Sequence, residues 1–114
     1  MLKTDKRILE QIVAEIAVAD SLLCEVSYEV FESSEEKKRA VAMTVINVGE
    51  LAKHLSEEFF KSYSMLELKY AARTRDIYAH GYATLSFPMV YKTATTSFTE
   101  LRDNILNLLN SEDR

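Results

Sequence analysis

Residues 4–26, TDKRILEQIVAEIAVADSLLCEV, decide the fold, because their apolar side chains recur with the period of an α-helix. Successive spacings of four, four, three, four and three residues define one apolar stripe, formed by Ile8, Ile12, Ile16, Ala19, Leu23 and Val26. Further apolar residues widen this stripe: Leu9, Val13 and Leu22. We therefore expect a long, buried helix that begins near Thr4 or Asp5, either of which can cap its free amides. Cys24, near its end, is expected in the core.

The same periodicity recurs in three later segments, at about residues 35–55, 65–81 and 88–109. Serines precede the first two of these segments and can cap them: Ser33 or Ser34, and Ser64. Pro88 suits the first turn of the last helix. The connecting residues 27–33 and 56–64 carry aromatic side chains and are expected to form short helical turns.

The composition favours the same fold class. Only two glycines and one proline occur among 114 residues, so few positions would interrupt a helix. We expect an all-α protein, an up-and-down four-helix bundle with one or two extra short helices, in a single domain over residues 1–114.

Charge and cysteine content limit the setting in which the chain acts. Cys24 is the only cysteine, so no internal disulfide can form and a reducing compartment fits. We find no signal peptide and no apolar run near the roughly 18 residues of a membrane span, and we expect a cytoplasmic protein without membrane contact. The net charge of −4 argues against a broad nucleic-acid surface, although residues 69–82 hold three cations and one anion.

Residues 72–82, ARTRDIYAHGY, hold the candidate functional residues in the pattern R-x-x-x-x-H-x-Y, formed by Arg75, His80 and Tyr82. Arginine grips a phosphate with paired donors and stabilises charge that develops on it. Histidine titrates near neutral pH and serves as a general acid or base. Because RNA supplies its own 2′-hydroxyl nucleophile, this set suits RNA cleavage without a metal ion or other cofactor. We find no set of metal ligands in the sequence.

Helix geometry places Arg75 and His80 on different faces, about 140° apart around a continuous helix. Asp76, four residues before His80, shares its face, and so does Arg73. Either the helix ends or bends near His80, for which Gly81 is suited as a left-handed cap, or a second chain completes the site.

Simpler interpretations remain open for each of these residues. The motif could be a capped helix end with a surface ion pair. Asn47 and Glu50 could be solvated, or they could brace Arg75 from a facing helix. His54 is expected to be an exposed partner of Glu50, and Tyr70 and Tyr78 are expected in the core or an interface.

The order of several segments is more specific than the motif alone. These segments are DKRILE at residues 5–10, YEVF at 28–31, Ala40-Val41, NVGELAKHLS at 47–56 and RTRDIYAHGY at 73–82. Together they resemble the HepT-like family of HEPN domains, the toxin half of HEPN/MNT toxin–antitoxin pairs. The resemblance covers nearly the whole chain.

The resemblance implies an all-α homodimer in which two motif stretches face one cleft. It implies a metal-independent endoribonuclease toxin with Arg75 and His80 as catalytic residues, supported by Asp76, Arg73, Glu50 and Asn47. The implied partner is an MNT-type nucleotidyltransferase antitoxin, which neutralises the toxin by transferring AMP to Tyr82 and could form a larger assembly with it. In one departure, Asp76 stands where the family usually has Asn, which would weaken RNA binding or raise the pKa of His80.

Two other functions compete with the ribonuclease. The chain could be a non-catalytic nucleotide- or substrate-binding subunit of a small nucleotidyltransferase. It could also be a dimeric bundle in which the motif has only a structural role.

Overall fold

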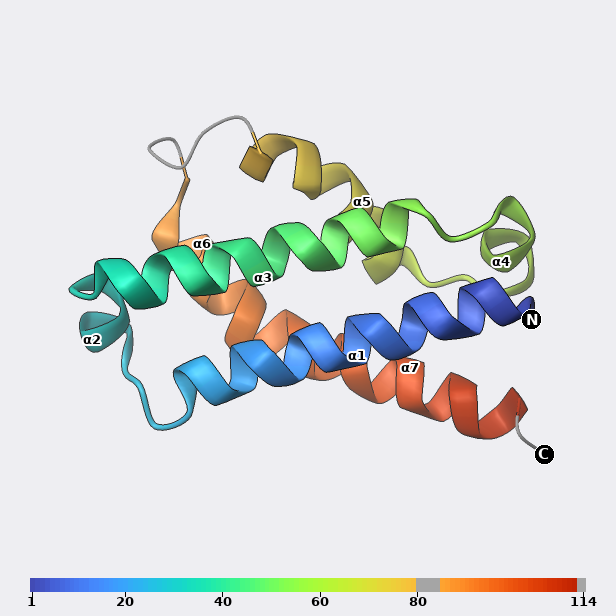
Figure 1. The fold of residues 1–114 in the computed structure, drawn as a ribbon, viewed down its shortest axis with the longest axis horizontal. Coiled ribbons are helices and arrows are strands. Elements are labelled where there is room, and N and C mark those ends of the chain that lie inside the picture. The colour runs from blue at the N-terminus through green and yellow to red at the C-terminus, as the bar shows by residue number, and fades with distance from the viewer. Residues whose placement is uncertain (80–84, 113–114) are drawn as a thin grey trace.

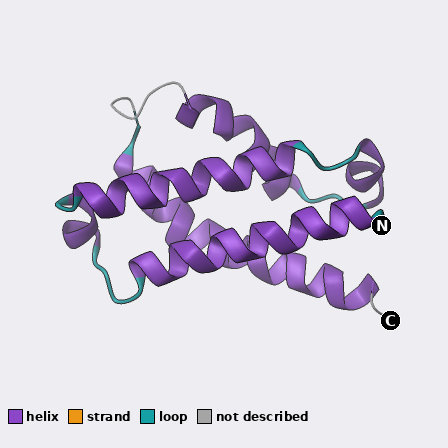
Figure 2. Ribbon diagram, in the orientation of Figure 1, coloured by secondary structure: helices purple, strands orange, loops and turns teal. Residues whose placement is uncertain are grey.

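The computed structural model describes the backbone of residues 1–79 and 85–112, and the side chains of residues 1–73 and 85–112. Its elements are α1 (Lys3–Leu23), α2 (Tyr28–Glu32), α3 (Glu35–Lys53), α4 (Glu57–Ser62), α5 (Leu66–Ala79), α6 (Phe87–Lys92), the π-helical segment η2 (Thr93–Ser97) and α7 (Phe98–Glu112). Helices account for most of the described chain, in which we find no strand (Figure 2). The predicted all-α bundle with extra short helices is confirmed.

The long helices alternate in direction (Figure 1). Helix α3 is central, because it packs against α1 on one side and α5 on the other, and α1 also packs against η2 and α7. The short helix α2 lies at one end of the bundle, and α4 lies at the other, beside the start of α1. Among the described residues, no helix combines the length and apolar character needed to cross a membrane.

The apolar stripes read from the sequence form the core. Helix α1 contributes Leu9, Ile12, Ile16, Ala19 and Leu23; α3 contributes Val41, Val45, Val48 and Ala52; the last helical segments contribute Val90, Ala94, Phe98, Leu101 and Ile105. Aromatic residues close both ends of this core. Phe31 of α2 packs against Tyr91 of α6, and Phe59 of α4 packs against Tyr63, which directly follows that helix.

Serine side chains cap three helices, α2, α3 and α4, and the predicted cap at Ser34 is among them. Ser34 accepts a hydrogen bond from the amide of Lys37 at 3.2 Å, and Ser56 accepts one from the amide of Phe59 at 3.1 Å. Helix α5 begins at Leu66, where the carbonyl oxygen of Met65 accepts a bond from the amide of Lys69. Met65, rather than Ser64, therefore directly precedes this helix.

The predicted cap of the first helix is wrong. Helix α1 begins at Lys3 after Leu2, whose apolar side chain forms no cap, and Asp5 is already within its first turn. The side chain of Asp5 is buried and binds Ser56, which lies 51 positions away. The carboxylate of Asp5, which the sequence suggested as a local cap, therefore binds a distant residue of the chain instead.

The end of α1 also differs from expectation. The helix stops at Leu23, three residues before the end of the apolar stripe, and Glu25 adopts a left-handed backbone with φ of 57°. This turn places Cys24 on the surface, so its predicted core position is wrong. The chain then leads into α2. Just before that helix, the carbonyl oxygen of Val26 accepts a 2.7 Å hydrogen bond from the hydroxyl of Tyr91.

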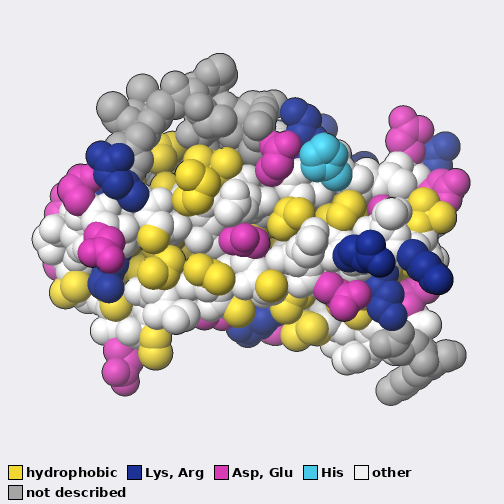
Figure 3. Space-filling view, viewed as in Figure 1, with side chains coloured by type: hydrophobic (Ala, Val, Ile, Leu, Met, Phe, Trp, Pro, Cys, Tyr) yellow, Lys and Arg dark blue, Asp and Glu magenta, His cyan; other side chains and the backbone are white. Residues whose placement is uncertain are grey.

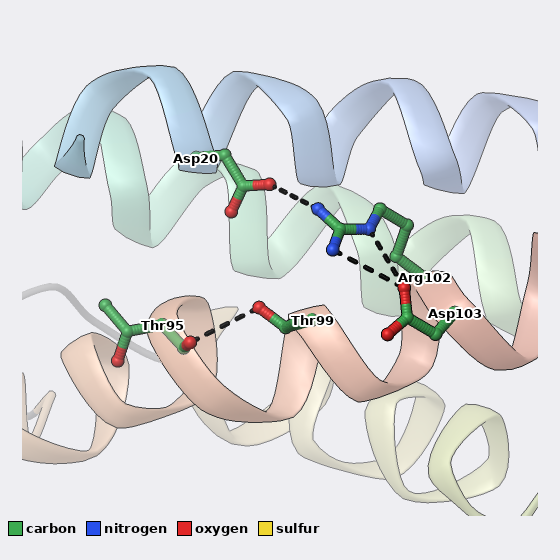
Figure 4. A network of polar contacts seen from close by, with 5 residues as sticks. All are labelled: Asp20, Thr95, Thr99, Arg102 and Asp103. Atoms are coloured by element: carbon green, nitrogen blue, oxygen red, sulfur yellow. Dashed lines mark hydrogen bonds and ion pairs between the residues drawn. The ribbon is translucent and has the colours of Figure 1, made fainter.

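The last helical segment contains a feature that its apolar spacing did not indicate. Residues Thr93–Ser97 form a π-helical turn between α6 and α7. The hydroxyl of Thr95 donates to the carbonyl oxygen of Tyr91 at 2.8 Å. The hydroxyl of Thr99 donates to the carbonyl oxygen of Thr95 at 3.3 Å (Figure 4). In the following helix, Arg102 binds Asp20 of α1 at 2.9 Å.

Candidate functional site

Helix α5 carries the first part of the predicted site. Its backbone is helical through Arg75 and Asp76 to Ala79, as the sequence predicts. The side chains of Arg75 and Asp76, and residues His80, Gly81 and Tyr82 entirely, lie outside what the structure describes. The assignment of Arg75 and His80 as the catalytic pair therefore stays a prediction.

Packing fixes the orientation of α5 on the bundle. Leu68 is fully buried, Met65 is nearly so, and α3 is the principal neighbour of the helix. The opposite face is open to solvent and carries Lys69 and Arg73. Because these residues are four positions apart, their side chains start from neighbouring points on the helix surface. The predicted supporting residue Arg73 is thus an exposed cation.

The supporting residues on α3 lie beside α1. Asn47 donates a 3.4 Å hydrogen bond to the carboxylate of Glu15, and Glu50 lines the same shallow groove of about 380 Å³. A contact of either residue with Arg75 stays a prediction.

His54 pairs with Glu50 as expected. Their Nε2 and Oε1 atoms lie 3.4 Å apart, one turn along α3. His54 is exposed, whereas Glu50 is half-buried and its Oε2 atom is buried. This histidine is therefore a surface ion-pair partner and a suitable reference for experiments on the motif histidine. Across the described residues, no cluster of three or more His, Cys, Asp or Glu side chains could hold a metal ion.

A second groove lies between α5 and the last helical segments. It has a volume of about 320 Å³, and its apolar rim includes Leu66, Tyr70 and Met89. Tyr70 is 65% exposed, so it is not a core residue. The sequence pattern missed this surface, although the spacing of Leu66, Tyr70 and Arg73 already placed them on one side of the helix.

The α1–α3 face of the molecule has a different character. Acidic and basic side chains are both scattered over it among apolar ones (Figure 3). Such a mixed surface lacks the single-sign charge that attracts a nucleic-acid backbone. The exposed cations of α5 are therefore the better candidates for contact with an anionic ligand.

Comparisons with known proteins agree with the motif. A family model described as "Ribonuclease HepT-like" matches residues 9–108, which include the complete R-x-x-x-x-H-x-Y pattern. The searches of curated proteins and of solved structures gave no significant match.

Proposed function

The chain belongs to the HepT-like ribonuclease family, and we propose that it is a metal-independent endoribonuclease, the toxin of a toxin–antitoxin pair. The observation that carries this proposal is the family match over residues 9–108, a range that contains Arg75, His80 and Tyr82 together. The helical backbone of α5 runs through both Arg73 and Arg75, which is consistent with the predicted motif helix.

The proposed reaction uses the substrate's own nucleophile. A general base removes the proton of a ribose 2′-hydroxyl, whose oxygen attacks the adjacent phosphorus. The bond from phosphorus to the 5′-oxygen breaks, and a general acid protonates this leaving oxygen. The products are a 2′,3′-cyclic phosphate and a 5′-hydroxyl end. His80 transfers protons in this scheme, and Arg75 stabilises the charge on the phosphate oxygens.

A homodimer would supply the remaining groups. One histidine cannot be base and acid in the same concerted step, whereas two chains that face one cleft bring two copies of His80 and of Arg75. The dimer would also remove the difficulty that these residues are about 140° apart on a continuous helix.

We further propose that a small nucleotidyltransferase neutralises the protein by modifying Tyr82. The phenol would lose its proton to a base, and its oxygen would attack the α-phosphorus of ATP. The bond from the α-phosphorus to the oxygen of the β-phosphate would break, so the tyrosine would acquire AMP and pyrophosphate would leave. The added phosphate places negative charge two residues from His80, where the RNA phosphate must bind. In this scheme, the modification blocks substrate binding by charge and bulk.

Cleavage of RNA by the purified protein tests the nuclease proposal. His80→Ala should lower the cleavage rate by about 100- to 10,000-fold, the usual contribution of a general acid or base. His54→Ala is the matched control, because it removes an exposed histidine on α3. Equal RNA cleavage by wild type and His80→Ala, or no cleavage by either, would reject the nuclease proposal.

The departure at Asp76 favours a second candidate, a non-catalytic binding subunit of a nucleotidyltransferase. A carboxylate next to Arg75 places negative charge beside the predicted phosphate site. Induced expression separates the two candidates. A toxin arrests growth when it is expressed alone and is rescued by the partner enzyme, whereas a binding subunit leaves growth unchanged in both cases.

A further inference from the structure

The solvent face of α5 has a composition that its role in packing does not explain. Lys69 and Arg73 form an exposed cationic pair on an otherwise acidic chain. The ammonium of Lys69 lies 5.5 Å from the centroid of the Phe60 ring, so a cation–π contact restrains the direction of this side chain. The pair is an exposed basic edge, in which Lys69 is restrained, and it is suited to a phosphate backbone.

An exposed aromatic ring stands beside this basic edge. Tyr70 precedes Arg73 by three residues, so these two side chains leave neighbouring points on the surface of α5. Lys69 comes directly before Tyr70, about 100° around the helix. It is 65% exposed and borders the 320 Å³ groove, together with Met89 of α6. Basic residues interleaved with an accessible aromatic ring are the usual elements of a single-stranded nucleic-acid site, in which bases stack on the ring.

The groove itself carries two acidic side chains, one on α5 and one on α7. Glu67 accepts a 2.8 Å hydrogen bond from the side-chain amide of Asn104, which holds its carboxylate toward α7, and Glu100 also lines the groove. These carboxylates repel phosphate but accept hydrogen bonds from the N–H groups of a base. The charge asymmetry therefore favours a strand whose backbone follows Lys69 and Arg73 and whose base enters the groove.

We propose that Lys69, Tyr70 and Arg73 form a subsite for one nucleotide of single-stranded RNA, with the base stacked on Tyr70. This inference rests on the proposed ribonuclease function, because the subsite takes a nucleotide next to the one that is cleaved. Lys69 and Arg75 are six residues apart, or about 9 Å along the helix axis. They also lie about 120° apart around the helix, so a strand that contacts both positions must pass obliquely across α5.

The test measures, by fluorescence anisotropy, how tightly the full chain binds a short 2′-O-methyl RNA. This RNA lacks the nucleophilic hydroxyl and so cannot be cleaved. Tyr70→Ala should weaken binding about tenfold, the usual scale of one base–aromatic stack, whereas Tyr70→Phe should bind like wild type. Lys69→Gln should reduce the slope of log affinity against log salt by about 0.7, the value for one phosphate contact on a single strand.

Matched controls exclude general effects of charge and surface. Arg7→Gln removes an exposed cation from α1, and Met43→Ala removes an exposed apolar side chain from α3. Both should bind the oligonucleotide like wild type. Equal binding by Tyr70→Ala, Lys69→Gln and these controls overturns the subsite, and so does a wild-type protein that does not bind the oligonucleotide.

Two further readouts separate the explanations. If Tyr70→Ala alters the sedimentation mass and leaves RNA affinity unchanged, the groove is a contact between copies of the protein, and the subsite is rejected. Cleavage assays keep this result distinct from the proposed function. If the wild-type protein cleaves RNA and the variants bind the oligonucleotide with unchanged affinity, only the subsite is rejected. If binding depends on Tyr70 but the wild-type protein does not cleave RNA, only the nuclease proposal is rejected.

Discussion

The buried carboxylate of Asp5 accepts two hydrogen bonds from Ser56, one from its backbone amide at 2.9 Å and one from its hydroxyl at 2.6 Å. Ser56 in turn accepts a bond from the amide of Phe59 and so caps α4. The first turn of α1 is therefore tied to the start of α4. Because Asp5 is only 2% exposed, water cannot readily replace these bonds.

Removal of the Asp5 carboxylate should destabilise the fold. Asp5→Ala leaves the amide of Ser56 without this acceptor, and we expect a loss of about 1–3 kcal/mol in the free energy of unfolding. Urea denaturation measures the change, with Glu10→Gln on the exposed face of α1 as control. A double-mutant cycle with Ser56→Ala should show strong coupling, and additive effects would contradict the hydrogen bonds described above.

The Asp5 contact illustrates what the sequence could and could not predict about the fold. Periodic spacing identified the buried stripes, because the burial of one helix face is a local property of the sequence. The partner of Asp5 lies 51 residues away, and local capping rules cannot identify such a partner. The π-helical turn at Thr93–Ser97 was missed for another reason, since the apolar spacing there fits an α-helix equally well.

The ion pair of Arg102 with Asp20 should contribute much less to stability than the apolar core. Both side chains are about one-third exposed or more, and exposed pairs are usually worth about 0.2–1 kcal/mol. Arg102→Gln should therefore cost less than about 1 kcal/mol, and the cost should fall at high salt. Ile105→Ala, which opens the core beside it, should cost about 2–5 kcal/mol in the same urea experiment. A larger loss for Arg102→Gln than for Ile105→Ala would contradict this ranking.

Replacement of Asp76 by the residue that the family usually has should strengthen RNA binding. Asp76→Asn removes one negative charge from the neighbourhood of Arg75. The repulsion between this charge and an RNA phosphate is worth about 1 kcal/mol or less in water. We expect KM for an RNA substrate to fall by up to about fivefold. Steady-state kinetics at low and high salt measure this change, and the difference should shrink as salt screens the charge. A higher KM for the variant would show that the carboxylate assists substrate binding.

Loss of the Tyr82 hydroxyl should separate activity from neutralisation. Tyr82→Phe keeps the ring but removes the oxygen that would accept AMP, so the variant should cleave RNA like wild type and resist the partner nucleotidyltransferase. Intact mass after incubation with the partner and an adenylyl donor measures the modification. Tyr70→Phe is the control for loss of another phenol, and AMP transfer to the Tyr82→Phe variant would place the modification elsewhere.

The contact between α4 and the end of α7 predicts a response to alkaline pH. The hydroxyl of Tyr63 donates a hydrogen bond to the carboxylate of Glu112, and this bond raises the pKa of Tyr63 above its ordinary value of 10.0. The protonated phenol therefore stabilises the fold at pH below 10, and this contribution is lost as the pH rises through the higher folded pKa. Thermal unfolding of Tyr63→Phe should lack this part of the alkaline decline. An identical pH profile for the variant would exclude the contribution.

For the candidate site, the sequence predicted the helix that carries the motif. It predicted less well which side chains of that helix are exposed and what lies next to them. It placed Arg73 and Arg75 on one helix because the apolar spacing of Met65, Leu68 and Ala72 continues into the motif. Tyr70 was predicted in the core or in an interface, and its exposure excludes the core, where an aromatic residue on an amphipathic helix more often packs. Only the position of α6 relative to α5 shows that a groove adjoins this ring.

The π-helical turn between α6 and α7 has a consequence for the comparison of relatives. A π-turn holds one residue more than an α-turn, so it acts as a single insertion within a continuous helical segment. A relative that lacks this residue can continue α6 into α7 in α-helical geometry and keep the two segments in the same relative orientation. In an alignment, a relative without the turn should therefore show a one-residue gap between Val90 and Phe98. Only a gap at this position aligns the buried apolar residues of both flanking helices with those of the relative.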